Sequence, residues 1–188
     1  MNLPNKLTIL RIIMIPLFMV FFFLEEVPYN YLISAIIFVA AAFTDYLDGY
    51  IARKNNIVTD LGKFLDPIAD KCLVSTALIL MLFPRSAQIF PYYGSIAIAL
   101  ILARELMVSG FRIVAASKGL VLAADKSGKL KTFVQDVGIA VLLVGASINP
   151  LLYSLVNVIG LCIMGIATIL TIVSGIGYLV KNRQVLLK

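Results

Sequence analysis

The sequence has no histidine, no tryptophan and only two cysteines among its 188 residues. Without histidine, the commonest general base is missing, so proton transfer in any enzymatic reaction would fall to a carboxylate. Cys72 and Cys162 each lie in an apolar segment, and neither has a cysteine partner at a recognisable spacing. This pattern argues against both a disulfide framework and a zinc site.

Acidic residues are also scarce, with 10 Asp and Glu against 16 Lys and Arg, and charged residues make up only 14% of the chain. Hydrophobic residues make up 61%, and the mean hydropathy is +1.01. Such a chain is too apolar for a soluble domain. We therefore expect an all-α, polytopic membrane protein in which residues 1–188 form a single membrane domain.

Six apolar segments are predicted to be transmembrane helices. The first has no small-residue cleavage site after it, so it is a membrane helix rather than a signal peptide. We also expect a short amphipathic helix before it at the membrane surface, carrying Lys6 and Arg11; the alternative is that these two residues only mark topology. The segments are Leu7–Leu24, Tyr31–Ala52, Phe64–Phe83, Pro91–Arg112, Thr132–Ser147 and Leu151–Val180.

The basic residues orient these segments in the membrane. In the loops that share a side with Glu25, Glu26 and Asn149, the only basic residue is Arg85, whereas most other Lys and Arg fall on the opposite side. By the positive-inside rule, both termini are expected in the cytoplasm and the protein in the cell membrane. The net charge of +6 is thus a topology signal and an attraction for anionic lipid, and we expect no nucleic-acid partner.

Four of the few acids lie close together in the sequence, on either side of one predicted cytoplasmic loop. Asp45 and Asp48 are three residues apart, and Asp66 and Asp70 are four apart, so each pair shares a face if both segments are helical. The uncharged runs 31–44 and 72–83 are each shorter than the roughly 20 residues that a crossing needs. Both helices must therefore continue through their acids, which places them near the cytoplasmic membrane surface.

Four carboxylates packed near lipid repel one another, so a positive partner is required. Hard divalent cations accept oxygen ligands, and Mg²⁺ in particular binds through a few carboxylates plus substrate phosphates. Gly49 follows Asp48 and leaves room for a ligand, and Arg53 offers donors suited to phosphate oxygens. The stretch therefore predicts a metal-assisted phosphate site.

The spacing in this stretch resembles the signature of the CDP-alcohol phosphatidyltransferases. The resemblance implies that Asp45, Asp48 and Asp66 hold two divalent ions, Mg²⁺ or Mn²⁺, and that Asp70 is a further ligand, the catalytic base or both. It implies a CDP-lipid site at Asp48, Gly49, Arg53 and Gly62, and a homodimer. The matching positions are Asp45-x2-Asp48-Gly49-x2-Ala52-Arg53-x8-Gly62-x3-Asp66-x3-Asp70.

Each position also has a purely structural explanation. Asp66 precedes Pro67 and fits a helix N-cap, Arg53 fits a positive-inside residue, and Gly49 and Gly62 fit packing or turn glycines. Taken together at this spacing they favour a functional site, because acids near the membrane interior are costly.

A second cluster of charges is basic. Arg104 and Arg112 are eight residues apart and share a helix face, and the following loop adds three lysines. This cluster suits a second anionic group, the phosphate of an acceptor substrate; the alternative is a solvated basic loop attracted to the inner leaflet. Asp136 is a weaker site candidate. The predicted acceptor-binding residues are Arg112, Lys129, Lys131, Arg104 and Lys126.

Three looser motifs, NLPNKLTILR, RELMVSGFR and GKLKT, resemble the bacterial phosphatidylglycerophosphate synthases. That resemblance implies transfer of a phosphatidyl group from CDP-diacylglycerol to sn-glycerol 3-phosphate with release of CMP. Inositol phosphate, serine or phosphatidylglycerol as acceptor stays open. From other classes, a divalent-cation channel or transporter and a purely structural membrane protein stay open, as does a prenyltransferase, although its DDxxD-like runs are absent.

Overall fold

The computed structural model describes residues 2–54, 60–83, 89–91, 93–120, 126–148 and 150–184. Within these ranges the regular structure is entirely helical, which confirms the predicted fold class. The helices are α1 (Leu3–Phe23), α2 (Asn30–Lys54), α3 (Asp60–Leu80), α4 (Gly94–Ser117), α5 (Lys126–Ala146) and α6 (Pro150–Lys181).

Each predicted apolar segment corresponds to one helix. As the length argument required, α2 continues through Asp45 and Asp48, and α3 continues through Asp66 and Asp70. Because α3 already begins at Asp60, Asp66 lies inside the helix and is not its N-cap. Each pair of acids therefore shares one face of a continuous helix.

The N-terminal region differs from the expectation. Residues 3–23 form one continuous helix, so a separate short amphipathic helix before the first apolar segment is wrong. Pro4 in the first turn favours a helix start at Leu3, since a proline there costs no hydrogen bond. The polar residues Asn5, Thr8 and Arg11 recur every third position and are all buried, so they belong to the face of α1 that packs on its neighbours.

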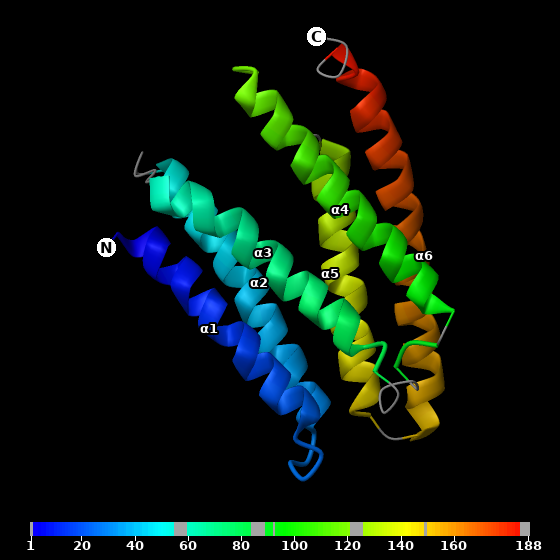
Figure 1. Cartoon of the computed structure of the whole chain (residues 1–188). Coiled ribbons are helices and arrows are strands. Elements are labelled where there is room, and N and C mark those ends of the chain that lie inside the picture. Colours follow the sequence, from blue (N-terminus) through cyan, green and yellow to red (C-terminus); the bar gives the residue numbers. More distant parts are fainter. Residues whose placement is uncertain are drawn as a thin grey trace.

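The helices form two groups of three (Figure 1). In the first group α1 packs along both α2 and α3, while α2 and α3 contact each other over a shorter stretch. In the second, α6 packs along α4 and α5, and α2 and α5 join the two groups. The aromatic and aliphatic residues that fill the core include Phe18, Phe22, Phe38, Leu78, Met81, Ile101, Leu142 and Met164.

Within the described ranges, three helical stretches are long and apolar enough to cross a membrane: Leu3–Phe23, Asn30–Gly49 and Leu152–Lys181. Large apolar side chains cover the outside of the helices, as lipid contact requires; Leu106 is 72% exposed and Ile169 63%. The protein is therefore a multi-pass membrane protein. The start of α1 and the end of α6 lie toward the end of the molecule where α2 finishes and α3 begins (Figure 1).

Candidate active site

A buried arginine of α1 lies between the two acids of α2. Arg11 donates from Nη1 to Oδ1 of Asp45 at 2.6 Å and from Nη2 to Oδ2 of Asp48 at 2.5 Å. The side chain of Arg11 is 0% exposed, that of Asp48 is 3% exposed and that of Asp45 is 44% exposed. The guanidinium therefore supplies the positive charge that these carboxylates need at this depth.

The first helix also contacts an acid of α3. Thr8 donates its hydroxyl hydrogen to Oδ1 of Asp66 at 2.6 Å, and Thr8 is fully buried. Thr8 and Arg11 are three residues apart, so one face of α1 reaches both acid-bearing helices. Sequence reasoning did not find these contacts; the available signal was the three-residue recurrence of polar residues in an otherwise apolar run.

Asp70 lies one turn further along α3 and is half-buried. It lines a cavity of about 220 Å³ that is bounded by side chains of α3, α4, α5 and α6. Three of the predicted acceptor-binding cations, Arg104, Arg112 and Lys129, line the same cavity. The full lining is Pro67, Asp70, Lys71, Arg104, Glu105, Val108, Ser109, Arg112, Gly128, Lys129, Thr132 and Tyr178.

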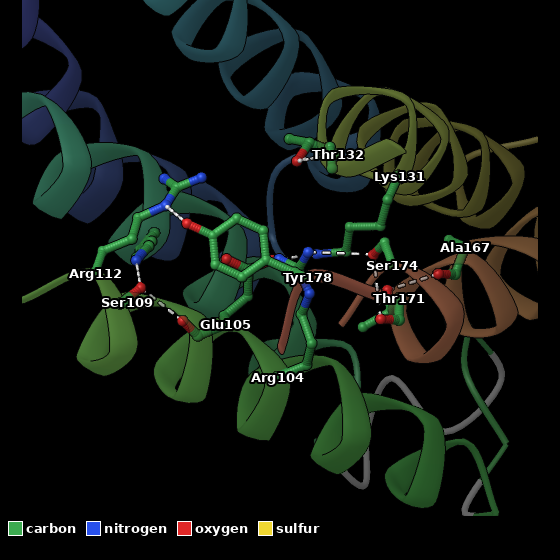
Figure 2. A network of polar contacts seen from close by, with 12 residues as sticks. Arg104, Glu105, Ser109, Arg112, Lys131, Thr132, Ala167, Thr171, Ser174 and Tyr178 are labelled. Atoms are coloured by element: carbon green, nitrogen blue, oxygen red, sulfur yellow. Dashed lines mark hydrogen bonds and ion pairs between the residues drawn. The ribbon is translucent and has the colours of Figure 1, made fainter. Parts of the chain in front are cut away.

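Glu105 is a second acid, beside Asp70, in the wall of this cavity (Figure 2). Its Oε1 accepts a hydrogen bond from Nζ of Lys131 at 2.5 Å and lies 3.4 Å from Nη1 of Arg104. Arg104 also donates from Nη2 to Oγ of Ser174 at 3.1 Å, which connects α4 to α6. Lys131 is only 1% exposed, so Glu105 neutralises a buried ammonium as well as part of the Arg104 charge.

Arg112 contacts Tyr178 of α6, and its side chain is otherwise exposed. Its Nε donates to the hydroxyl of Tyr178 at 3.2 Å, and its guanidinium carbon lies 5.5 Å from the centre of the same ring. Figure 2 shows Arg112 and Ser109 on neighbouring turns of α4. Ser109 accepts a hydrogen bond from Nζ of Lys71 on α3 and donates its own to the carbonyl of Glu105. Hydrogen bonds thus fix the positions of Arg112 and of one further cation at the cavity, Lys71.

The remaining predicted site residues are distributed as follows. Gly49 is half-buried in α2, and Gly62 is buried in the first turn of α3. Lys131 lies on a smaller cavity of about 20 Å³ that also reaches Asp70 and Glu105. The side chains of Arg53 and Lys126 lie outside the described residues.

Two neighbouring residues of α5 each have one buried side-chain oxygen. Oδ1 of Asp136 and Oε1 of Gln135 are buried, and neither finds a hydrogen-bond partner among the residues that the structure describes. Gln135 lines the smaller cavity beside Asp70. Sequence analysis ranked Asp136 as a weak candidate and did not find Gln135.

Divalent cations accept carboxylate oxygens as ligands, so the residue types of the α2 and α3 acids fit such an ion. In the part of the chain that the structure describes, no three His, Cys, Asp or Glu side chains are gathered tightly enough to hold a metal ion. The charge of Asp45 and Asp48 is instead compensated by Arg11, which is bonded to one oxygen of each carboxylate. The structure therefore has a positive charge, that of Arg11, between Asp45 and Asp48. The binding of two divalent ions by the four acids stays a prediction.

Comparison with known proteins places these observations in a family. Residues 1–174 match the CDP-alcohol phosphatidyltransferase family. The chain is 39% identical to the CDP-diacylglycerol–glycerol-3-phosphate 3-phosphatidyltransferase of Bacillus subtilis, over 98% of this chain and 97% of that protein.

Proteins with the same name in two other bacteria are similar. The protein of Rickettsia bellii is 40% identical over 94% of this chain and 93% of its own length. That of Shigella flexneri is 35% identical over 99% and 97%. The resemblance drawn from the aspartate spacing is confirmed: the chain belongs to the CDP-alcohol phosphatidyltransferase family.

Proposed function

We propose that this protein transfers the phosphatidyl group of CDP-diacylglycerol to sn-glycerol 3-phosphate, giving phosphatidylglycerophosphate and CMP. The names of relatives that match nearly its whole length support this reaction. The structural observation that carries the proposal is the cavity in which Asp70 lies with Arg104, Arg112 and Lys129. A carboxylate beside three cations suits an acceptor that has both a reactive hydroxyl and a phosphate.

The CDP-lipid would bind on the side of the α2 and α3 acids. Asp45, Asp48, Asp66 and Asp70 would hold two divalent ions, Mg²⁺ or Mn²⁺, which supply charge neutralisation for the diphosphate and for the departing CMP. Arg53 would donate further hydrogen bonds to the diphosphate. Gly49 and Gly62 would allow the nucleotide to approach the backbone of the two helices closely.

Asp70 would act as the general base. It lies on the face of α3 that also carries Asp66, and it lines the cavity with the basic cluster, so it would touch both proposed substrate sites. In the reaction, the acceptor oxygen forms a bond to the phosphorus of the phosphatidyl group, and the bond from that phosphorus to the CMP oxygen breaks. Asp70 takes the proton of the attacking hydroxyl.

The acceptor phosphate would be bound by Arg112, Lys129 and Arg104. Arg112 is exposed in this cavity and anchored by Tyr178, so its remaining donors are free to turn toward an anion. Lys131 would add its charge from the smaller cavity, where Glu105 shares it. Lys126 belongs to the same proposed subsite because it begins the helix that carries Lys129 and Lys131.

We extend the proposal to topology and assembly. All six helices would cross the cell membrane, with both termini and the site in the cytoplasm, as the distribution of Lys and Arg favours. The third, fourth and fifth helices would keep their charged side chains within the cavity rather than facing lipid. A homodimer follows from the family resemblance.

The test is CMP release by the purified protein in detergent, with Mg²⁺ or Mn²⁺ and CDP-diacylglycerol. A panel of acceptors, namely glycerol 3-phosphate, inositol phosphate, serine and phosphatidylglycerol, is offered separately, with an acceptor-free reaction and an EDTA reaction as controls. We expect release that needs both the metal and glycerol 3-phosphate. CMP release with only one of the other acceptors would show that this other compound, and not glycerol 3-phosphate, is the acceptor substrate. Metal uptake into sealed vesicles without CMP release would show that the protein is a transporter and not a transferase.

A further inference from the structure

Arg11 is the only arginine among the buried polar and charged residues of the described chain. Burying an arginine costs free energy unless its donors are satisfied, and four acceptors satisfy this one. Besides Asp45 and Asp48, its Nε lies 3.3 Å from the carbonyl of Ala41 and 3.4 Å from Oγ1 of Thr44. All four acceptors belong to α2, whereas Arg11 belongs to α1.

The two carboxylates differ in their access to solvent. The side chain of Asp48 is 3% exposed, while that of Asp45 is 44% exposed. An ion arriving from the cytoplasm would therefore reach Asp45 first. Because Arg11 is bonded to an oxygen of each carboxylate, a bound cation and the guanidinium would have to share the same two acids.

We propose that Arg11 is a positioning residue that acts as a built-in counter-ion. It holds Asp45 and Asp48 side by side when no metal is bound, and it shares them with the divalent cation when one binds. This inference rests on the proposed metal-dependent function. Two consequences follow: the metal-free protein depends on Arg11 for stability, and the charge of Arg11 weakens the binding of a cation to the same acids.

A simpler alternative is that Arg11 only fastens α1 to α2. In that case, its loss lowers stability by the same amount with and without metal, and the affinity for metal does not rise. A counter-ion behaves differently, since a divalent cation can replace the missing charge. The two explanations are therefore separated by metal binding and by metal-dependent stability, and no measurement of activity is needed.

The experiment uses the full chain purified in detergent, as wild type and as Arg11→Gln and Arg11→Lys. The thermal midpoint is measured in EDTA and in Mn²⁺, and the Mn²⁺ dissociation constant is measured from the electron paramagnetic resonance signal of free Mn²⁺. Lys6→Gln is the matched control, because Lys6 is an exposed cation on the same helix and its substitution removes the same charge.

For Arg11→Gln we expect a lower midpoint than wild type in EDTA, a larger upward shift with Mn²⁺ and an affinity for Mn²⁺ about tenfold tighter. Arg11→Lys keeps the charge but loses the two-pronged contact, so it should fall between wild type and Arg11→Gln. Lys6→Gln should match wild type in both measurements.

Equal Mn²⁺ shifts and equal affinities in wild type and Arg11→Gln would overturn the inference while leaving the proposed metal site intact. Absence of any Mn²⁺ binding by wild type would overturn the metal site itself and this inference with it. If Arg11→Gln folds only when Mn²⁺ is present, the inference is supported. If it folds in neither condition, Arg11→Lys decides: a larger Mn²⁺ shift than in wild type supports the inference, and an equal shift refutes it.

Discussion

The hydroxyl of Thr8 donates a hydrogen bond to Oδ1 of Asp66 across 2.6 Å, joining α1 to the helix that carries Asp70. Three residues later, on the same face of α1, Arg11 holds Asp45 and Asp48 of α2. The helices α2 and α3 contact each other only over a short stretch, whereas α1 contacts acids of both helices. The first helix is thus part of the candidate site as well as a membrane span.

Replacing Thr8 by Val removes the hydroxyl and keeps the shape of the side chain. A hydrogen bond to a charged acceptor is worth about 1.5–3 kcal/mol, so we expect kcat/KM for CMP release to fall about tenfold or more. Thr8→Ser should keep most of the activity. Thr168→Val is the control, because in the described part of the chain the hydroxyl of Thr168 bonds to a backbone carbonyl of its own helix, that of Met164, and to no acid. An unchanged rate in Thr8→Val would show that Asp66 does not need this contact.

Glu105→Gln should destabilise the protein because it leaves the buried ammonium of Lys131 without its carboxylate. Breaking a buried ion pair costs about 3–5 kcal/mol, and the lower end applies here because the side chain of Glu105 is 24% exposed. Thermal unfolding in detergent measures the loss. The double variant Glu105→Gln with Lys131→Met should recover part of it, and Glu26→Gln, at an exposed acid, should change nothing. A double variant less stable than Glu105→Gln would contradict the pairing.

Arg112→Gln and Lys129→Gln should each raise the KM for glycerol 3-phosphate while leaving the KM for CDP-diacylglycerol near that of wild type. The physical reason is that both cations line a cavity whose described walls come from α3, α4, α5 and α6 and not from α2. The loss of one charge-assisted contact amounts to about tenfold in affinity. Steady-state kinetics with each substrate varied in turn gives both constants. Lys118→Gln, beyond the end of α4 and outside the cavity lining, is the control. A matching rise in the KM for the CDP-lipid would place these residues in the other subsite.

Two glycines of α6 give a packing prediction. A Cβ on Gly160 would come within 2.7 Å of two side-chain atoms of Leu142 on α5, whereas a Cβ on Gly165 would meet nothing within 4 Å. Gly160→Ala should therefore lower stability by about 1–3 kcal/mol, and Gly165→Ala should leave it unchanged or slightly higher. Thermal midpoints of the two variants check this. Equal effects would mean that α5 and α6 do not pack as described.

The sequence was sufficient to predict the helices and the positions of the acids on them, but it did not predict which side chains the acids contact. The shortness of the uncharged runs beside Asp45 and Asp70 required α2 and α3 to continue through the acids, and both helices do. The role of Arg11 was not predictable in this way, because its partner Asp45 lies 34 residues away and periodicity reports only neighbours on one helix. Sequence reasoning therefore left Arg11 as a surface or topology residue.

The basic cluster shows the same limit. The spacing of Arg104 and Arg112 correctly indicated a shared helix face, and both line the cavity with Asp70. Sequence reasoning did not predict that Nη1 of Arg104 and Oε1 of its neighbour Glu105 lie 3.4 Å apart. It also did not find that Lys131 is buried against Glu105, since pairing between α4 and α5 depends on how the helices pack.

The most direct test of the whole account is CMP release by Asp70→Asn, with CDP-diacylglycerol, glycerol 3-phosphate and Mn²⁺. Loss of a general base costs about 10²–10⁴-fold in rate, so we expect turnover to fall by at least about a hundredfold while the thermal midpoint stays near that of wild type. Turnover at the wild-type rate in a folded Asp70→Asn protein would contradict the assignment of the cavity as the place where the acceptor is activated.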